Sequence, residues 1–264
     1  MSVLAEIVAD TRERVAARKE AVPQAELARA GAKRVSDGDS RSFRGALDGP
    51  GVSIIAEHKR RSPSAGVIRE GVALEEVVGA YERAGAAAIS VLTEEGRFAG
   101  SIDDLRAARK ATRLPILRKD FVVDDYQVHE ALAAGADAVL LIVAALAPEE
   151  LAELHQLAQG LNLDVLVEVH DERELAVALE LEPGIIGINN RDLASLEVDT
   201  ARAFELRPQV PEGVVVVAES GFRTRAELER LLEAGVDAVL IGEALMRAPD
   251  IEAACRALTG VGQS

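Results

Sequence analysis

The segment AGADAVL at residues 134–140 returns almost unchanged as AGVDAVL at residues 234–240. A weaker copy, AGAAAIS, occupies residues 84–90. In each copy a glycine ends a helical pattern and an apolar run follows at once. Glycine readily adopts the left-handed conformation that ends helices, so Gly85, Gly135 and Gly235 are expected to be helix C-caps. The repeat therefore predicts a helix–strand unit that recurs along the chain.

Outward from these copies, eight β-branched or apolar runs appear 20 to 35 residues apart. They begin near Val52, Ala87, Pro115, Asp137, Asp164, Gly184, Gly213 and Val236. Stretches with helical periodicity separate them, including 75–83, 103–110, 149–159 and 225–233. Each run is too apolar to have one face in water, which is typical of parallel strands covered by helices.

Eight repeated right-handed βα units close into a barrel. We therefore predict an α/β protein with a (β/α)8 TIM barrel and an N-terminal helical extension. An open doubly wound sheet is the alternative, but no Gly-x-Gly-x-x-Gly motif follows the first run. One domain over residues 1–264 is expected, with the extension at 1–48 and the barrel at 49–264.

Composition restricts the partners. The 264 residues carry 30 Lys+Arg against 45 Asp+Glu, a net charge of −15 that repels nucleic acid and anionic lipid. The longest apolar run, 138–147, is too short to span a bilayer, and Glu6 and Asp10 stand where a signal peptide would be apolar. The single cysteine, Cys255, suits a reducing compartment. We expect a cytoplasmic protein, a monomer or weak homo-oligomer, that binds neither nucleic acid nor membrane.

Polar side chains gather where the predicted strands end. In chain order these ends carry Glu57 and Lys59, Thr93 and Glu94, Lys119, Glu168, Asn189 and Arg191, Glu219 and Ser220, and Gly242 and Glu243. Only the fourth run ends purely apolar, at Leu140 and Ile142. In a (β/α)8 barrel these ends line the mouth that holds the active site.

The rarity of lysine in this chain supports the prediction of an active site at the strand ends. The chain has five lysines against 25 arginines, and two of the five, Lys59 and Lys119, fall at strand ends. An amine can be tuned to give up a proton, whereas a guanidinium cannot. Any one of these charged residues alone is typical of a structural ion pair. Two lysines and three glutamates at one mouth indicate a catalytic site.

The last two strand ends suggest an anion site. Glu219-Ser220-Gly221 and Ile241-Gly242-Glu243 each lead into a helical pattern, where backbone N–H groups bind phosphate without basic side chains. Tight turns alone would also explain both glycines. Two of the five phenylalanines, Phe98 and Phe121, follow the second and third strands and suggest an apolar wall, with Leu140 and Leu193 nearby. The four histidines show no metal-ligand spacing, so no metal is expected.

Seven segments of this chain resemble one known family. They are IAEHKRRSPSAG (55–66), SVLTEEGRFAGS (90–101), LRKDFVVDDYQ (117–127), LVEVHDE (166–172), GINNRDL (187–193), AESG (218–221) and LIGEALMR (240–247). In this order they are similar to the indole-3-glycerol-phosphate synthase family, from about residue 4 to 258. His58 departs from the family, which usually has an apolar residue there. Alternation along the strand places it on the face away from Glu57 and Lys59.

The resemblance implies a barrel with its N-terminal extension packed over the mouth, and no cofactor. It implies ring closure, decarboxylation and dehydration of 1-(2-carboxyphenylamino)-1-deoxyribulose 5-phosphate, a small phosphorylated substrate, to indole-3-glycerol phosphate in tryptophan biosynthesis. Lys119 is implied as the general acid toward the C2′ carbonyl, and we expect Lys59 and partial burial to lower its pKa. Lys59 is also implied to hold the anthranilate carboxylate.

The resemblance assigns the remaining roles by group. Glu168 serves one half of the dehydration with Glu57 and Lys59 as proton partners, the order left open. Asn189, Glu219 and Ser220 orient hydroxyls and lysines. The residues implied to bind the anionic ends of the substrate are Ser62, Arg191, Gly221, Gly242 and Glu243. Phe98, Phe121 and Leu140 are implied to pack against the anthranilate ring and press it toward the sugar chain, with Leu193 beside them.

Three alternatives remain at this point. A Schiff-base aldolase would use Lys119 to form an imine. An isomerase of a related aminated ribulose phosphate would need no second lysine, so Lys59 argues against it. A non-catalytic binding barrel leaves the three cavity glutamates unexplained.

Overall fold

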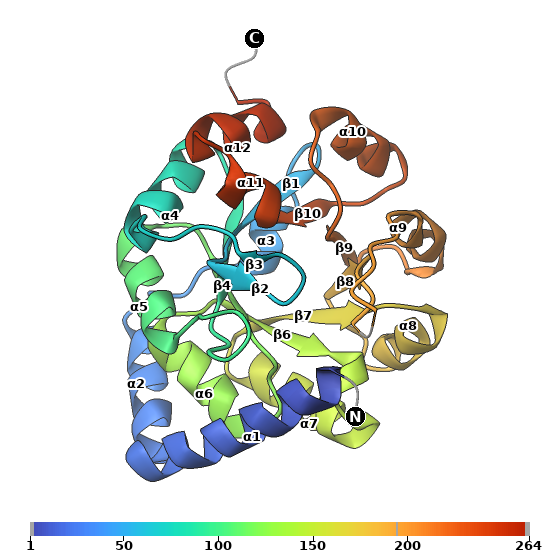
Figure 1. Cartoon of the computed structure of the whole chain (residues 1–264). Helices are drawn as coiled ribbons and strands as arrows, with labels where there is room; N and C mark the ends of the chain where they lie inside the picture. Colours follow the sequence, from blue (N-terminus) through green and yellow to red (C-terminus); the bar gives the residue numbers. More distant parts are fainter. Residues whose placement is uncertain (1–2, 194, 262–264) are drawn as a thin grey trace.

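Eight parallel strands close into a barrel in the computed structural model, which describes residues 3–193 and 195–261 (Figure 1). The ring runs β1-β10-β9-β8-β7-β6-β5-β4, and β4 pairs with β1 to close it. Each strand begins within two residues of the position predicted from sequence, so the expected (β/α)8 barrel is confirmed. The strands are β1 Ser53–His58, β4 Ala88–Leu92, β5 Ile116–Lys119, β6 Ala138–Ile142, β7 Asp164–Val169, β8 Ile185–Asn189, β9 Val215–Glu219 and β10 Ala238–Ile241.

Helices follow the strands and surround the barrel (Figure 1). Three of them end at the glycines singled out in the repeat: Gly85, Gly135 and Gly235 have φ angles of 83°, 106° and 82°. The surrounding elements are α4 Leu74–Arg83, α5 Ile102–Ala111, α6 Asp125–Ala134, η1 Val143–Ala145, α7 Pro148–Gly160, α8 Glu172–Leu179, α9 Ala201–Leu206, η2 Arg207–Gln209, α10 Arg225–Glu233, α11 Glu243–Arg247 and α12 Ile251–Thr259.

Alternation along the strands divides the apolar residues into two cores. In β1, Ile54 and Ala56 belong to the cluster between strands and helices, while Ile55 belongs to the cluster inside the barrel. Leu117 and Leu166 share that interior. Except in β6, which ends with Leu140 and Ile142, most inward positions nearer the strand ends are polar, so the interior changes from an apolar plug to a charged chamber toward the mouth.

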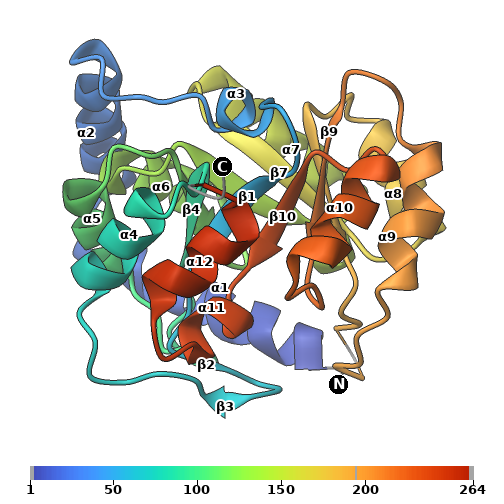
Figure 2. The ribbon, with the colours of Figure 1, turned by 90° about the horizontal axis from the view of Figure 1, so that it is seen from above.

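The N-terminal extension covers both ends of the barrel. It comprises α1 Val3–Ala21, α2 Gln24–Ser36 and α3 Phe43–Leu47. Phe43 and Leu47 of α3 pack into the interior cluster, as do Val3 and Leu4 at the start of α1. Figure 2 shows α3 and α1 at opposite ends of the strands. The start of α1 therefore lies at the mouth, as the family resemblance implied.

A small hairpin at the mouth was not predicted. Strands β2 Arg61–Ser62 and β3 Gly66–Val67 pair antiparallel and project at the same end of the barrel as α1 (Figure 2). Two-residue strands are too short to produce a periodic pattern, so the sequence contains no signal for them.

Candidate active site

A cavity of about 370 Å³ opens at the carboxyl ends of the barrel strands. Every side chain predicted for the site lines it except Ser62. Ser62 lines a smaller adjoining cavity, and its Oγ accepts a hydrogen bond from the N–H of Ala65 (3.2 Å) inside the hairpin turn. Residues spread over almost two hundred positions therefore converge on one chamber.

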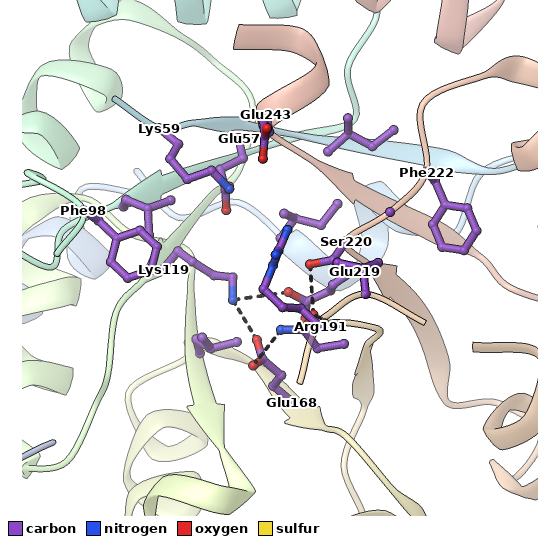
Figure 3. A pocket seen from close by; sticks show the side chains of 18 of the residues that line it. Glu57, Lys59, Phe98, Lys119, Glu168, Arg191, Glu219, Ser220, Phe222 and Glu243 are labelled. Atoms are coloured by element: carbon purple, nitrogen blue, oxygen red, sulfur yellow. Dashed lines mark hydrogen bonds and ion pairs between the residues drawn. The ribbon is translucent and has the colours of Figure 1, made fainter. Parts of the chain in front are cut away.

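Lys119 lies at the centre of this chamber (Figure 3). Its Nζ donates to Oε2 of Glu168 at 2.7 Å and lies 3.2 Å from Oε2 of Glu219. β5, β7 and β9 supply these three residues, and alternation turns all three side chains inward. Both carboxylates are almost fully buried, so the contacts are made in a low-dielectric environment where they are strong.

The prediction of a lowered pKa for Lys119 is wrong. Burial alone would lower this pKa, but the carboxylates of Glu168, Glu219 and Glu57 outweigh it and raise the pKa above its ordinary value. Lys59 contacts Glu57 instead, with Nζ and Oε1 2.6 Å apart. The second amine is therefore neutralised by its own carboxylate rather than acting on Lys119.

Glu168 and Glu219 have different environments although both contact Lys119. Burial raises the pKa of Glu168, but Lys119 and His170 overcome this and hold it well below the usual range. Burial raises the pKa of Glu219 to about 8, with Lys119 opposing and Glu168 reinforcing the shift. Oε1 of Glu219 is buried and accepts no hydrogen bond from the part of the chain that the structure describes. The environment therefore favours the ionised form of Glu168 and the protonated form of Glu219.

The side chain of Asn189 makes hydrogen bonds to three neighbours. Its Nδ2 donates to Oε1 of Glu168 at 3.1 Å. Its Oδ1 accepts from Oγ of Ser220 and from the N–H of Arg191, both at 3.0 Å. Ser220 has a φ of 65°, in the left-handed region, and this turns the chain sharply after β9. The carboxamide thus sets the position of both the base candidate and the hydroxyl.

Two glycines make room for carboxylates of the site. A Cβ at Gly187 would overlap Oε1 of Glu219, and one at Gly242 would overlap Oε1 of Glu57. Gly187 pairs in register with Glu168 across β7 and β8. The absence of side chains at these inward positions lets Glu219 and Glu57 lie flat against the barrel wall.

The loops after β8, β9 and β10 form the other side of the cavity. Gly221, with a φ of 99°, and Gly242 open onto it, as does Arg223, which the sequence reasoning did not select. The guanidinium of Arg191 donates to the carbonyl of Leu196 at 2.9 Å, which holds this cation beside the chamber. This side of the cavity is glycine-rich and carries two arginines.

Phe98 and Phe121 form the apolar side of the cavity with Leu140 and Leu193. Phe98 and Phe121 also line the adjoining cavity of about 80 Å³, whose outer wall is the start of α1. The site thus has an apolar recess that continues under the N-terminal extension.

Glu94 holds the loop that carries Phe98, a role not foreseen from sequence. Its buried carboxylate accepts three backbone N–H groups, from Gly96 (2.7 Å), Arg97 (2.6 Å) and Phe98 (2.9 Å). Arg14 of α1 lies 3.5 Å from the same carboxylate. Position alone marked Glu94 as a strand-end residue, but backbone hydrogen bonds to a side chain leave no sequence signature.

His170 was also missed. Its Nε2 lies 3.3 Å from Oε1 of Glu168, and its Nδ1 lies 2.9 Å from Oε2 of Glu174. Burial lowers its pKa, but the two carboxylates overcome this and raise it to about 10. The available signal was its position two residues after Glu168, which puts both on one face of the strand.

Other candidates lie outside the cavity. His58 is buried, as alternation predicted for a residue facing the helices, and burial lowers its pKa to about 4. Burial raises the pKa of the Cys255 thiol to about 12. Across residues 3–193 and 195–261, no three His, Cys, Asp or Glu side chains gather as a metal site would require. Within the same residues, every helix is too short or too polar to cross a bilayer.

A barrel mouth with two amines, several carboxylates and glycine-rich loops defines a (β/α)8 enzyme suited to acid–base chemistry on a small anionic substrate. Residues 4–258 match the family model described as indole-3-glycerol phosphate synthase. A curated relative with that name from Dehalococcoides mccartyi strain CBDB1 is 52% identical over 215 residues, covering 80% of this chain and 83% of the relative. Indole-3-glycerol phosphate synthase 2 of Streptomyces coelicolor is 46% identical over 258 residues, covering 98% and 99%.

The chain therefore belongs to the indole-3-glycerol phosphate synthase family, and the expectation of a decarboxylating lyase of tryptophan biosynthesis is confirmed. Among solved structures, a thiamine phosphate pyrophosphorylase from Pyrococcus furiosus superposes with a TM-score of 0.60 at 20% identity, covering 83% of this chain and 96% of that chain. An N-acetylmannosamine-6-phosphate 2-epimerase from Clostridium perfringens gives 0.59 at 16%, covering 77% and 90%. At these identities the likeness concerns the fold alone.

Proposed function

We propose that the residues of this cavity convert 1-(2-carboxyphenylamino)-1-deoxyribulose 5-phosphate to indole-3-glycerol phosphate by ring closure, decarboxylation and dehydration. The observation that carries the proposal is the contact of one ammonium, Lys119, with two buried carboxyl groups, Glu168 and Glu219, whose pKa values are shifted in opposite directions. Groups with divergent pKa values in one cavity are suited to separate acid and base steps.

Ring closure requires an acid at the C2′ carbonyl. Lys119 donates its proton to that oxygen as the ring carbon attacks. The raised pKa of Lys119 does not prevent this, because the alkoxide that forms in the same step is a stronger base than a lysine amine. Glu168 and Glu219 hold the ammonium in place until the carbonyl arrives.

Decarboxylation requires that the anthranilate carboxylate be held while its bond to the ring breaks. Lys59 supplies the cation for this task. Lys59 is paired with Glu57, and about a fifth of its side chain is exposed, so a carboxylate can approach it from the cavity.

Dehydration requires a base for the ring proton and an acid for the departing hydroxide. Glu168 is ionised at neutral pH and is assigned as the base. The Lys59 ammonium, held by Glu57, is assigned as the acid. Asn189 keeps Glu168 oriented through both steps.

Substrate binding uses the two remaining sides of the cavity. The aromatic ring packs against Phe98, Phe121 and Leu140, which presses it toward the sugar chain and favours ring closure by proximity. The phosphate binds on the opposite side, at the Gly221 and Gly242 loops beside Arg191 and Arg223. Ser62 is assigned to the neighbouring recess, where it can meet the carboxylate that Lys59 holds.

Incubation of the purified chain with the carboxyphenylamino substrate tests this proposal. Indole fluorescence should rise with release of one equivalent of CO2 per product, and Lys119→Ala should abolish both. Lys33→Ala is the matched control, because Lys33 is exposed and pairs only with Asp37 four residues on. Absence of product from the unmodified chain would overturn the proposal. A borohydride-trapped substrate adduct on Lys119 would favour the Schiff-base alternative instead.

We also propose that the chain works in the cytoplasm as a monomer or weak homo-oligomer without nucleic acid. Large exposed hydrophobic side chains are scattered singly over the described surface, at Val67, Val198, Leu232 and Val261. The net charge of −15 supports the exclusion of nucleic acid. Sedimentation at micromolar concentration tests the oligomeric state, and a stable dimer would contradict it.

A further inference from the structure

The ionised form of Glu168 is stabilised by the Lys119 ammonium, which loses its positive charge during the reaction. In the resting site its Oε2 accepts from Lys119 at 2.7 Å, and its side chain is 1% exposed. Once Lys119 has donated its proton to the substrate, this contact no longer carries a positive charge. A carboxylate buried among other carboxyl groups then becomes protonated unless another cation faces it.

The imidazole of His170 is placed to be that cation. Its Nε2 lies 3.3 Å from Oε1 of Glu168, the oxygen that Lys119 does not contact. Nε2 is buried and, among the residues that the structure describes, makes no hydrogen bond, so with a protonated ring the contact to Glu168 is an ion pair. Both oxygens of Glu168 therefore have a basic group beside them.

Glu174 fixes the imidazole from the other side. Its Oε2 lies 2.9 Å from Nδ1 of His170 and accepts the backbone N–H of the same residue at 2.8 Å. Two charged groups thus face the ring, Glu168 from β7 and Glu174 from α8, and Lys119 contacts the far oxygen of Glu168. A ring between two carboxylates retains both of its protons well above the usual pH, in accord with the raised pKa of about 10.

His170 itself does not touch the cavity. Neither His170 nor Glu174 is among the residues that line either cavity of the site, so they act behind Glu168 and not on the substrate. Resting on the proposed function, we infer that His170 is a positioning residue that keeps Glu168 ionised and oriented as the base while Lys119 is neutral, with Glu174 holding the imidazole in place.

The test compares His170→Asn, His170→Gln and Glu174→Gln with the unmodified chain over pH 5 to 9. Loss of the imidazolium raises the pKa of Glu168, so the acid limb of the kcat profile should move up by about one pH unit in the histidine variants. On that limb kcat should fall by up to about tenfold, as a shift of one pH unit allows, while KM stays within about twofold. Glu174→Gln should show the same pattern more weakly, because its amide oxygen still accepts from Nδ1.

Glu172→Gln is the matched control, since Glu172 lies in the same first turn of α8, is exposed and pairs only with Gln209 across the surface. It should leave kcat, KM and the acid limb unchanged. An equal effect of Glu172→Gln and Glu174→Gln would overturn the inference, because it would show a general response of the helix to charge. Unchanged kcat and an unchanged acid limb in both folded histidine variants would overturn it as well.

A second readout needs no turnover. Two-bond ¹H–¹⁵N spectra distinguish an imidazolium from a neutral ring, and the His170 signals are identified by their loss in the variants. At pH 8 His170 should remain doubly protonated, while His58, whose pKa is lowered to about 4, serves as the neutral reference. A neutral His170 ring at pH 8 would contradict the inference even if the unmodified chain forms product, which separates this failure from failure of the proposed function.

Discussion

Nζ of Lys119 lies 2.7 Å from Oε2 of Glu168, although 49 positions separate the two residues in the chain. The contact exists because β5 and β7 flank β6 in the closed ring, and Lys119 at the end of β5 and Glu168 one residue before the end of β7 both face inward. β6 between them ends apolar, with Leu140 and Ile142. The strand between the two charged side chains therefore adds no charge of its own to the contact.

The first prediction concerns the role of this pair. Lys119→Ala and Glu168→Gln should each lower kcat by about 10²- to 10⁴-fold with little change in KM, because each removes a proton-transfer group and not a binding surface. Steady-state kinetics by indole fluorescence measures both constants. A rise in KM with kcat preserved would show that the pair only binds substrate.

The second prediction concerns stability and pH. The folded-state pKa of Glu219 is raised to about 8 from an ordinary value of 4.5, so the folded chain retains a proton that the unfolded chain releases. The stability linked to this proton is present at low pH and is lost as pH rises from about 4.5 through 8. Glu219→Gln should therefore raise Tm at pH 8.5 and have little effect at pH 5.

Calorimetry at the two pH values checks this prediction. Each kcal/mol gained should raise Tm by about 2–4 °C in a chain of this size. Glu153→Gln, a substitution at an exposed position on α7, is the control and should change Tm equally little at both pH values. Destabilisation by Glu219→Gln at pH 8.5 would mean that the ion pair with Lys119 outweighs the burial of the carboxyl.

The third prediction concerns Gly187, which leaves space for the carboxyl group of Glu219. Gly187→Ala should displace Oε1 of Glu219 and so loosen its contact with Lys119, lowering kcat by about tenfold. Gly184→Ala, at the start of the same strand, is the control, because its Cβ would meet only the side chain of Arg44 at 3.4 Å. Equal kinetics for the two variants would show that the position of Glu219 does not matter.

The fourth prediction concerns the loop of Phe98. Glu94→Gln replaces one acceptor oxygen with an NH2 group that faces backbone donors, so the loop should loosen and KM should rise by about tenfold, with a smaller effect on kcat. The neighbouring Glu95→Gln is the control, since half of that side chain is exposed. If Glu94→Gln has the same KM as the unmodified chain, the loop of Phe98 does not contribute to substrate binding.

The sequence was sufficient for the barrel and for most of the lining. Strand positions followed from apolar runs, and the glycine C-caps followed from the repeat around Gly135 and Gly235, because both depend on local patterns. The convergence of Lys119, Glu168 and Glu219 followed from the rule that barrel strand ends share one mouth.

The features of the site that could not be predicted from sequence depend on distances between atoms of residues far apart in the chain. The pKa of Lys119 rises because three carboxyl groups surround it while Lys59 is held by Glu57. The spacing of residues along the sequence does not reveal how many carboxyl groups lie near one amine. The hydroxyl of Ser62 is used within a hairpin too short to predict. Backbone anchoring by Glu94 and the ion pair behind Glu168 are likewise contacts between distant segments.

The most direct measurement is a crystal structure of the chain with indole-3-glycerol phosphate bound. The account predicts the phosphate at the loops of Gly221 and Gly242, the indole ring against Phe98 and Phe121, and Nζ of Lys119 within about 3–3.5 Å of the ring carbon that carried the carbonyl oxygen. A product seated with its phosphate among the aromatic residues, or with its ring out of reach of Lys119 and Glu168, would contradict it.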